Sequence, residues 1–278
     1  STTYYVRVRH AGTTYGDSGW SSGVSFTTAA SFTDADAQAI IDEMTVTPSS
    51  ARQTVINDLV VGLKDDGIWS KLDRLWVMAA HTAQAAQLDW KNPTGTALTE
   101  VNSPTFTTDQ GYTGDGSTAY LDTDYTASTD ATNITLNSHF IGFWLRAVAT
   151  SSSFYAGVQH SAGTWGAQRL NGTDVRGYAN GGIFGNIAEA TGFYAFDRDG
   201  ASSTNAYKDG SNARTESDAS AASLPDLKLL LLASNNVTLG GAQNHTDAQL
   251  SVCVVGGSLT ATEHSNLYSR LNTYMGAL

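Results

Sequence analysis

The residues of this sequence best suited to hold another molecule are aromatic rings close to amide side chains in two glycine-rich segments. They are Trp165, Gln168 and Asn171 in the first segment, and Tyr178, Asn180 and Phe184 in the second. Sugar binding needs aromatic platforms beside amide and hydroxyl groups, and loops carry binding residues more often than strands do. Because glycine-rich segments favour loops, we predict a sugar-binding site at these residues. The competing interpretation is that the rings fill the core of the fold.

Motifs for catalysis are scarce in the sequence. Glycoside hydrolysis needs two carboxyl groups a few ångströms apart, and the sequence contains no E-x-D-x-x-E segment that would supply them. The glutamates are few and scattered: Glu43, Glu100, Glu189, Glu216 and Glu263. The sequence also lacks an H-E-x-x-H zinc motif and a phosphate-binding loop. We therefore predict no catalytic residues and a protein that is not an enzyme.

Two acidic segments could contribute oxygen ligands to a calcium ion. Asp122 and Asp124 form the first, and Asp197 and Asp199 form the second; hard cations prefer clustered carboxylate and carbonyl oxygens. Neither segment continues into an EF-hand loop, so turn formation is the favoured explanation of these aspartates. The lone Cys253 excludes an intrachain disulfide and a cysteine-based zinc site. We predict no metal and no other cofactor, with Ca²⁺ as the alternative.

The composition excludes several classes of partner. The chain has 15 Lys and Arg residues against 26 Asp and Glu residues, a formal net charge of -11, so it should repel nucleic-acid phosphates and anionic lipids. The longest apolar run, Leu229 to Ala233, has the length of a buried strand, so we expect no insertion into a membrane. Only 15% of the residues are charged, and such hydroxyl-rich surfaces suit extracellular or virion proteins.

The elements that must position these residues are mostly short strands. Asp115-Gly116 predicts a two-residue hairpin turn that opens a large β-sandwich. Residues 139–149 are apolar on both faces, which indicates a central strand. Further strands are expected over residues 154–159, 165–170, 175–178, 192–198, 205–208, 213–215, 227–233 and 250–255. Thr260 and Glu263 form a capping-box pattern that predicts a closing helix.

A helical connector is predicted before the sandwich. Asp34 and Asp36 precede a short apolar run that indicates a capped helix, and Pro48 precedes a second helix with an apolar residue at every fourth position. A strand over residues 74–79 and an alanine-rich helical piece ending near Leu88 should follow.

The first residues predict a pair of strands of a different kind. Tyr4, Val6 and Val8 alternate with polar residues, and the run from Trp20 to Thr28 reads W-S-x-x-V-x-F-T-T. This segment resembles the last two strands of a fibronectin type III domain, in which Tyr4 would match the tyrosine of the sandwich corner. We expect these strands to complete a domain lying upstream or to pack on the residues that follow.

Three later segments carry a second resemblance. They read L-K-D-D-G-I-W-S-K-L-D, L-W-V-M-A-A-H-T-A-Q-A-A-Q-L-D-W-K-N-P and S-P-T-F-T-T-D-Q-G-Y-T-G-D-G-S-T-A-Y-L-D-T. In this order they resemble a module of bacteriophage structural proteins, especially tail and receptor-binding proteins, over roughly residues 51–278. That module resembles the concanavalin A-like jelly roll. The expected fold is mainly β, with a fibronectin-like unit over residues 1–28, a connector over residues 29–72 and a jelly-roll domain over residues 73–278.

The resemblance implies a function and partners. A tail or fibre protein of this kind would sit on the virion surface, contact other virion proteins and attach to a host-surface glycan through a lectin-like domain. It would be a homo-oligomer, with a trimer expected. Two alternatives stay open: a carbohydrate-active enzyme or its accessory binding module, and an architectural head-decoration protein.

Overall fold

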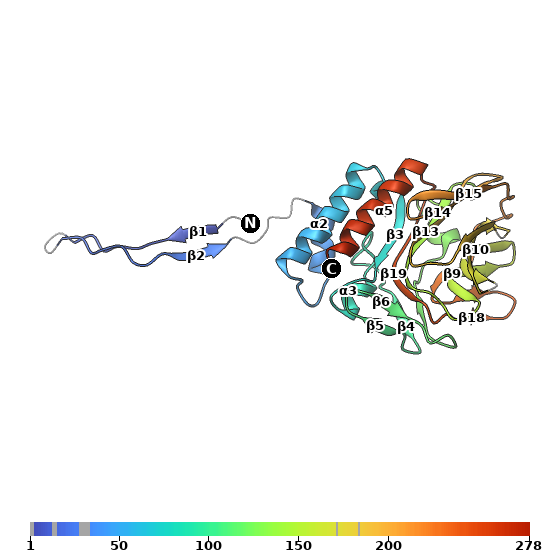
Figure 1. Ribbon diagram of the computed structural model, residues 1–278, viewed down its shortest axis with the longest axis horizontal. Coiled ribbons are helices and arrows are strands. Elements are labelled where there is room, and N and C mark those ends of the chain that lie inside the picture. Colours follow the sequence, from blue (N-terminus) through green and yellow to red (C-terminus); the bar gives the residue numbers. More distant parts are fainter. Residues whose placement is uncertain (1–2, 13–15, 28–33, 171, 183) are drawn as a thin grey trace.

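A computed structural model describes residues 3–12, 16–27, 34–170, 172–182 and 184–278 of the chain. Near the N-terminus, strands β1 (Thr3–Val6) and β2 (Val24–Thr27) pair antiparallel, with Tyr4 opposite Phe26. This two-stranded ribbon is the pair of strands predicted there, and Figure 1 shows it projecting away from the rest of the chain.

Six helical segments of the described chain separate and follow the strands, and side chains cap the N-terminal ends of α1, α2, α3 and α5. They are α1 (Ala35–Asp42), α2 (Ser50–Asp65), the 3-10 turn η1 (Trp69–Lys71), α3 (Ala83–Gln87), α4 (Ala127–Asp130) and α5 (Ala261–Gly276). The carboxylate of Asp34 accepts hydrogen bonds from the first backbone amides of α1, and Ser49 caps α2. Thr260 and Glu263 form the complete capping box that the sequence predicts for α5.

One sheet has nine strands, and its main order is β12-β11-β10-β9-β16-β7-β4. Its strands are β4 (Thr99–Val101), β7 (Tyr120–Asp122), β9 (Ser153–His160), β10 (Gly163–Leu170), β11 (Asp174–Gly181), β12 (Phe184–Ala188) and β16 (Leu230–Leu231). In addition, β17 (Ser234–Asn236) pairs with β9, and β18 (Gly241–Gln243) pairs with β17. We call it the nine-stranded sheet.

The other sheet has eight strands, and its main order is β15-β14-β13-β8-β19-β6-β5. Its strands are β3 (Leu72–Val77), β5 (Thr105–Thr107), β6 (Gly111–Thr113), β8 (His139–Ala147), β13 (Gly192–Gly200), β14 (Ser203–Lys208), β15 (Ser211–Glu216) and β19 (Gln249–Gly256), with β3 paired to β19. We call it the eight-stranded sheet.

Aromatic rings fill the space between the two sheets. Phe143 of β8 stacks on Tyr155 of β9 across this space, with ring centroids 5.4 Å apart, and on Tyr194 of the neighbouring strand β13 at 5.5 Å. All three rings are fully buried. Offset stacking adds to the large apolar area that such rings remove from water, so this cluster is a main source of cohesion between the sheets.

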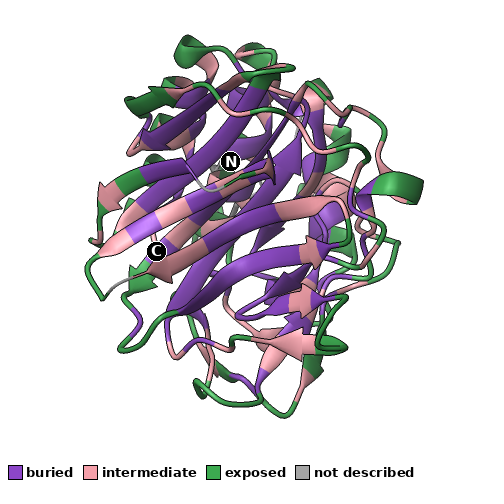
Figure 2. Ribbon diagram, turned by 90° about the vertical axis from the view of Figure 1, so that its right-hand side faces the viewer, coloured by how far each residue is buried: buried purple, intermediate pink, exposed green. Residues whose placement is uncertain are grey.

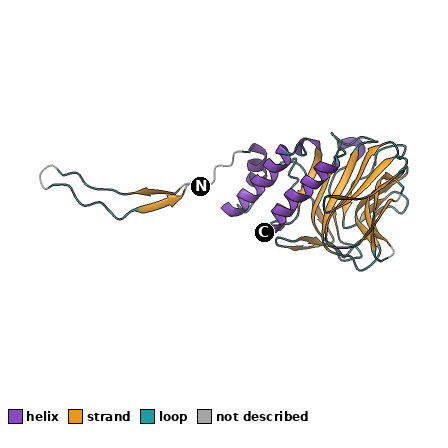
Figure 3. Ribbon diagram, turned by 45° about the horizontal axis from the view of Figure 1, so that its top comes forward, coloured by secondary structure: helices purple, strands orange, loops and turns teal. Residues whose placement is uncertain are grey.

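A layer of helices covers one outer face of the sandwich. Helices α2 and α5 lie against the eight-stranded sheet, as Figure 1 and Figure 3 show. Leu267 and Leu271 of α5 are fully buried, and the Tyr274 hydroxyl donates a 3.1 Å hydrogen bond to the Ala79 carbonyl oxygen. The outer face of the nine-stranded sheet faces the viewer in Figure 2 and is not covered by α2 or α5.

The chain is therefore a mainly β jelly-roll sandwich with a closing helix, as the sequence predicts. The predicted central strand is β8, which lies between β13 and β19. The predicted hairpin around Asp209-Gly210 is formed by β14 and β15. The proposed boundaries between fibronectin-like unit, connector and jelly roll stay predictions.

The predicted hairpin at Asp115-Gly116 is wrong. Of the flanking strands, β6 pairs with β5 and β19, whereas β7 pairs with β4 and β16, so this turn carries the chain from one sheet to the other. Turn chemistry explains the residues, because Gly116 has φ +72° and the Asp115 carboxylate accepts backbone hydrogen bonds from Ser117, Thr118 and Ala119. These bonds hold the pKa of Asp115 far below its usual range.

The predicted strand over residues 227–233 is too long. The strand there, β16, comprises only Leu230–Leu231. It ends at Leu232, whose φ of +66° is a left-handed conformation that interrupts the extended run. The predicted strand over residues 74–79 is displaced by two residues, since β3 begins at Leu72.

Candidate functional site

Trp165 lies in a strand, as expected for residues 165–170, and not in a loop as expected for the sugar-binding site. It belongs to β10, it is 1% exposed, and its ring meets the edge of His139 from the opposite sheet, with centroids 6.2 Å apart. Glycine neighbours misled the prediction, because Gly166 has φ +141° within a strand that passes close to the backbone of β9. Trp165 therefore fills the space between the sheets and offers no surface to a ligand.

Asn180 and Phe184 are also covered. Asn180 of β11 is held by the His160 ring at 2.8 Å and donates from Nδ2 to the Ser223 carbonyl oxygen at 2.9 Å. Phe184 of β12 packs edge-on against Phe196, with centroids 5.7 Å apart. Both side chains are buried and engaged within the protein, so strands rather than loops position them.

Gln168 and Tyr178 are brought together by neighbouring strands. The Gln168 amide donates a 2.6 Å hydrogen bond to the Tyr178 hydroxyl, and the Tyr178 ring stacks on Phe154 at 5.9 Å. Burial raises the pKa of Tyr178 above its ordinary value. Both residues are half-buried, so ligand binding by this pair stays a prediction. The remaining predicted residue, Asn171, lies outside the described residues.

A better-formed site lies at the other sheet, where α5 meets the end of β8. We call it the aromatic hollow; its volume is about 400 Å³. Its main lining residues are Trp144, Leu145, Arg146, Thr191, Asp209 and Tyr268. Trp144 and Tyr268 are half-buried and stack with ring centroids 5.8 Å apart and ring planes 12° from parallel. The hollow thus combines an aromatic stack with a guanidinium, a carboxylate and a hydroxyl group.

Strand alternation directs the β8 side chains into or out of the sandwich. Phe143 and Leu145 are fully buried, while Trp144 is half-buried and Arg146 exposed. Successive side chains of a strand point to opposite faces. Trp144 and Arg146 therefore share the outer face of the eight-stranded sheet, next to α5.

The turn between β14 and β15 completes the hollow from the other side. Gly210 has φ +74°, and a Cβ atom placed there would lie only 2.9 Å from the Cβ atom of Tyr268 and from the Cα atom of Ser265. Glycine is therefore required for the turn to approach α5 this closely. The contact sets Asp209 beside Tyr268.

Hydrogen bonds fix the polar side of the hollow. The Asp209 carboxylate accepts a 2.8 Å bond from the Phe193 backbone amide and a 2.7 Å bond from the Lys208 ammonium group. Lys208 also donates to the Thr191 carbonyl oxygen at 2.9 Å and lies 4.7 Å from the centroid of Tyr194. A carboxylate held in this way is ready to accept hydrogen bonds from the hydroxyl groups of a ligand.

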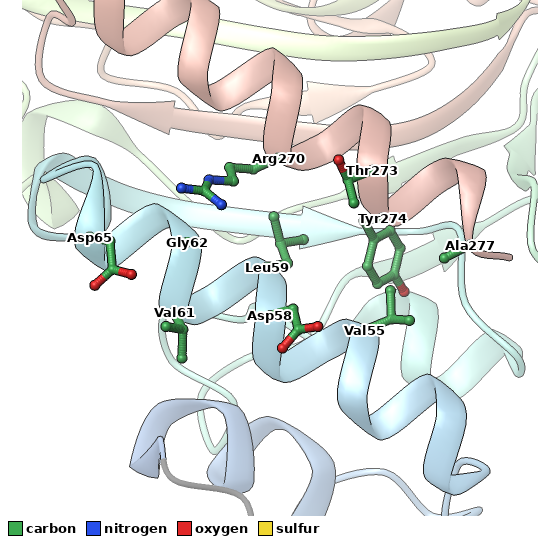
Figure 4. A pocket seen from close by; sticks show the side chains of 10 residues that line it. All are labelled: Val55, Asp58, Leu59, Val61, Gly62, Asp65, Arg270, Thr273, Tyr274 and Ala277. Carbon is green, nitrogen blue, oxygen red and sulfur yellow. The ribbon is translucent and has the colours of Figure 1, made fainter.

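A larger hollow lies between α2 and α5. Its volume is about 510 Å³, and Figure 4 shows Val55, Leu59 and Tyr274 among its apolar lining. The helices approach closely at Gly62, where a Cβ atom would lie 2.7 Å from the Arg270 side chain. Arg270 is paired with Asp66, its Nε donating at 2.8 Å, rather than aimed at a ligand. The other polar side chains that line this groove are those of Asp58, Asp65 and Thr273.

A small polar pocket of about 210 Å³ lies at Arg74, Asp89, Asn92, Thr96, Thr123, Asp124 and Asp130. Burial raises the pKa of Asp89 to about 6, although the Leu75 and Lys91 backbone amides and the Arg74 guanidinium favour its charged form. Asp89 joins β3 to the segment after α3, because its backbone forms a β-bridge with Trp76.

The aspartates considered for Ca²⁺ are engaged by protein groups. Asp124 pairs with Lys228 at 2.6 Å, and Asp197 accepts hydrogen bonds from Ser258 and the Leu259 backbone amide. No group of three or more His, Cys, Asp or Glu side chains is arranged to hold a metal ion within the described part of the chain. Across the same residues, no helix is both long and apolar enough to cross a membrane.

Comparison with known proteins finds similarity in structure alone. No protein-family model matches the sequence, and no curated protein is significantly similar to it. Trypanosoma rangeli sialidase in complex with sialic acid is 12% identical over 80% of this chain and 39% of its own chain, with a TM-score of 0.49. The botulinum neurotoxin serotype D binding domain is 9% identical over 73% of this chain and 51% of its own, with a TM-score of 0.48.

A third solved structure is domain 4 of an extracellular arabinanase from Geobacillus stearothermophilus, in complex with arabinotriose. It is 12% identical over 62% of this chain and 82% of its own, with a TM-score of 0.40. The chain spans 39% of the sialidase and about half of the neurotoxin domain. Similarity at this level does not assign a function, so we base the function on the chain's own side chains.

Sequence reasoning missed the aromatic hollow for an identifiable reason. The alternation of residues 139–149 shows Trp144 and Arg146 on one face of a strand, but that face is as apolar as the other. The structure shows that part of this face stays uncovered beside α5, and the sequence pattern does not show it. The closest available signal was Arg146 itself, a charged residue on the same face as Trp144.

Proposed function

We propose that this chain is a non-catalytic, lectin-like sandwich domain that binds a glycan in the aromatic hollow. One observation carries the proposal: Trp144 and Tyr268 form a half-buried stack that opens onto a hollow containing Arg146, Asp209 and Thr191. Sugar rings have apolar faces that pack on aromatic rings and hydroxyl groups that need polar partners around them. The hollow offers both kinds of group at one place.

The wider setting that we propose follows from the sequence resemblance. Residues 51–278 resemble a module of bacteriophage tail and receptor-binding proteins, which supports a tail or fibre component on the virion surface. In this role the chain would contact other virion proteins, assemble as a homo-oligomer, with a trimer as our first expectation, and attach the particle to a host-surface glycan. No cofactor is needed for such attachment.

The test compares matched aromatic variants on host-surface polysaccharide. The parent protein should bind with a dissociation constant between millimolar and micromolar, and Trp144→Ala and Tyr268→Ala should each weaken binding about 10-fold or more. Tyr178→Ala is the control, because Tyr178 is also a half-buried aromatic residue but lies on the opposite sheet. Thermal unfolding of each variant verifies that the sandwich is intact.

The control also separates the two candidate sites. Loss of binding in Tyr178→Ala with full binding in Tyr268→Ala would refute the aromatic hollow and favour the pair formed by Gln168 and Tyr178. Full binding by all three variants would refute both sites.

A carbohydrate-active enzyme is the second candidate, because a buried carboxyl with a raised pKa suits a general acid. Asp89, whose pKa is raised to about 6, would be that acid in the polar pocket beside Asp124 and Asp130. Release of reducing ends from polysaccharide by the parent, lost in Asp89→Asn, would favour the enzyme. If the parent protein shows neither glycan binding nor turnover of polysaccharide, an architectural role in the virion is favoured.

A further inference from the structure

Arg146 is unusual among the cationic side chains of the sandwich. It is exposed at the end of β8 on the rim of the aromatic hollow, and it makes no hydrogen bond or ion pair with any described residue. Every other Lys and Arg between residues 34 and 278 has a hydrogen-bond or ion-pair partner: Arg52, Lys64, Lys71, Arg74, Lys91, Arg169, Arg176, Arg198, Lys208, Arg214, Lys228 and Arg270.

The other charges of the hollow balance each other. Asp209 is paired with Lys208 at 2.7 Å, so the carboxylate and the ammonium group largely neutralise one another. The charge of Arg146 is therefore the uncompensated charge of the hollow. It is a positive one, in a chain whose formal net charge is -11.

We propose that the aromatic hollow selects an acidic saccharide, in which a sugar carboxylate binds the guanidinium of Arg146. This inference rests on the proposed function and names its ligand class. A guanidinium presents parallel N–H donors in a planar fork that matches a carboxylate, and such charge-assisted pairs are stronger than neutral hydrogen bonds. The sugar ring would pack on Trp144 and Tyr268 while its hydroxyl groups donate to Asp209.

The arrangement explains why this one arginine carries the selectivity. Trp144 and Arg146 are two residues apart on β8, so both side chains leave the same face of the strand. A ring stacked on Trp144 thus brings a substituent of that ring toward Arg146. A neutral sugar could still stack, but it would leave Arg146 without its partner.

The experiment measures binding of acidic oligosaccharides and of the same oligosaccharides after reduction of their carboxyl groups to alcohols. The probes are oligogalacturonate, oligomannuronate and sialyl-lactose, each against its reduced form, by titration calorimetry. The parent should bind at least one acidic form about 10- to 100-fold more tightly than its reduced form, the range for a hydrogen bond to a charged group. Arg146→Gln should lose this preference and keep its affinity for the reduced form.

Arg7→Gln is the matched control, because it removes the same charge from the exposed segment that follows β1 instead of from the hollow. It should keep the full preference for the acidic form. Arg146→Lys should keep only part of it, since a single ammonium group cannot form the planar two-bond contact.

The outcomes separate this inference from the proposed function. If no acidic form binds better than its reduced form, or if Arg146→Gln retains the preference, the selection of acidic saccharides is refuted. Binding of neutral forms that still depends on Trp144 would leave the glycan-binding function standing. If the preference survives in both Trp144→Ala and Tyr268→Ala, the hollow is not the site and both proposals fail.

Discussion

The buried carboxylate of Asp197 holds the closing helix α5, and with it Tyr268, against the sandwich, and a substitution of Asp197 tests this role. Asp197 lies on β13 and is 1% exposed. It accepts a 2.7 Å hydrogen bond from the Ser258 hydroxyl and a 2.9 Å bond from the Leu259 backbone amide, just before α5 begins. His264 of α5 is fully buried, and its Nε2 lies 3.0 Å from the same carboxylate.

Asp197→Ala should lower the free energy of unfolding by about 3 kcal/mol. Each hydrogen bond to a charged acceptor contributes about 1.5–3 kcal/mol, and the lost desolvation of the carboxylate offsets part of that sum. The substitution also leaves the Ser258 hydroxyl, the Leu259 amide and the His264 ring without their acceptor in a water-free site. Ser258→Ala is the matched control, because it removes one bond only and should cost about 1 kcal/mol.

Urea unfolding followed by tryptophan fluorescence measures both variants, and glycan retention measures the effect on the hollow. Asp197→Ala should also weaken glycan binding, because α5 carries Tyr268, but less than Tyr268→Ala does. A loss in Asp197→Ala no greater than that in Ser258→Ala would show that this carboxylate does not anchor α5, and the reasoning would be wrong.

Three further predictions concern buried or strained positions. Arg198 is fully buried and donates to the Ala179 carbonyl oxygen at 2.6 Å and to the Asp218 carboxylate at 2.8 Å. Arg198→Met should therefore lower the free energy of unfolding, measured in urea, by about 3 kcal/mol. A decrease below about 1 kcal/mol would contradict this. The pKa of Asp89 is raised to about 6 in the folded state, so its protonation stabilises the fold: this contribution is complete below the unfolded pKa near 3.8 and is lost as the pH rises through 6. Relative to Asp89→Asn, the parent should therefore gain up to about 3 kcal/mol between pH 8 and pH 4, and a pH-independent difference would refute the shift. Gly210→Ala should lower the melting temperature and the glycan affinity more than Gly240→Ala does. Gly240 has the same left-handed backbone conformation, but a Cβ atom added there would meet no atom within 4 Å. Equal effects of the two substitutions would mean that the contact of Gly210 with α5 is unimportant.

Local patterns in the sequence predicted the elements whose causes are themselves local. The capping box of Thr260 and Glu263 lies within one helical turn, so its residues suffice to start α5. The turn at Asp209-Gly210 likewise connects β14 and β15, which pair directly across it. The apolar run of β8 predicted a strand buried on both sides, because such a composition suits the middle of a covered sheet.

Local patterns gave a wrong prediction where the pairing of a strand depends on residues far away in the sequence. Asp115-Gly116 has hairpin chemistry, yet the flanking strands pair in different sheets, since sheet membership depends on hydrogen bonds to strands far away in the sequence. The apolar composition of residues 227–233 predicts one strand, but Leu232 turns the chain out of the extended conformation.

The sequence by itself determined the mainly β class, the closing helix, and the supply of aromatic and amide side chains, because periodicity and turn chemistry are local properties of the chain. Only the tertiary structure decided which rings are available to a ligand. Trp165 and Trp144 both lie in glycine-containing strands, but Trp165 faces the opposite sheet, whereas Trp144 faces outward at a place that α5 leaves open. Exposure depends on what packs against a face, and that is set by contacts between residues distant in the sequence.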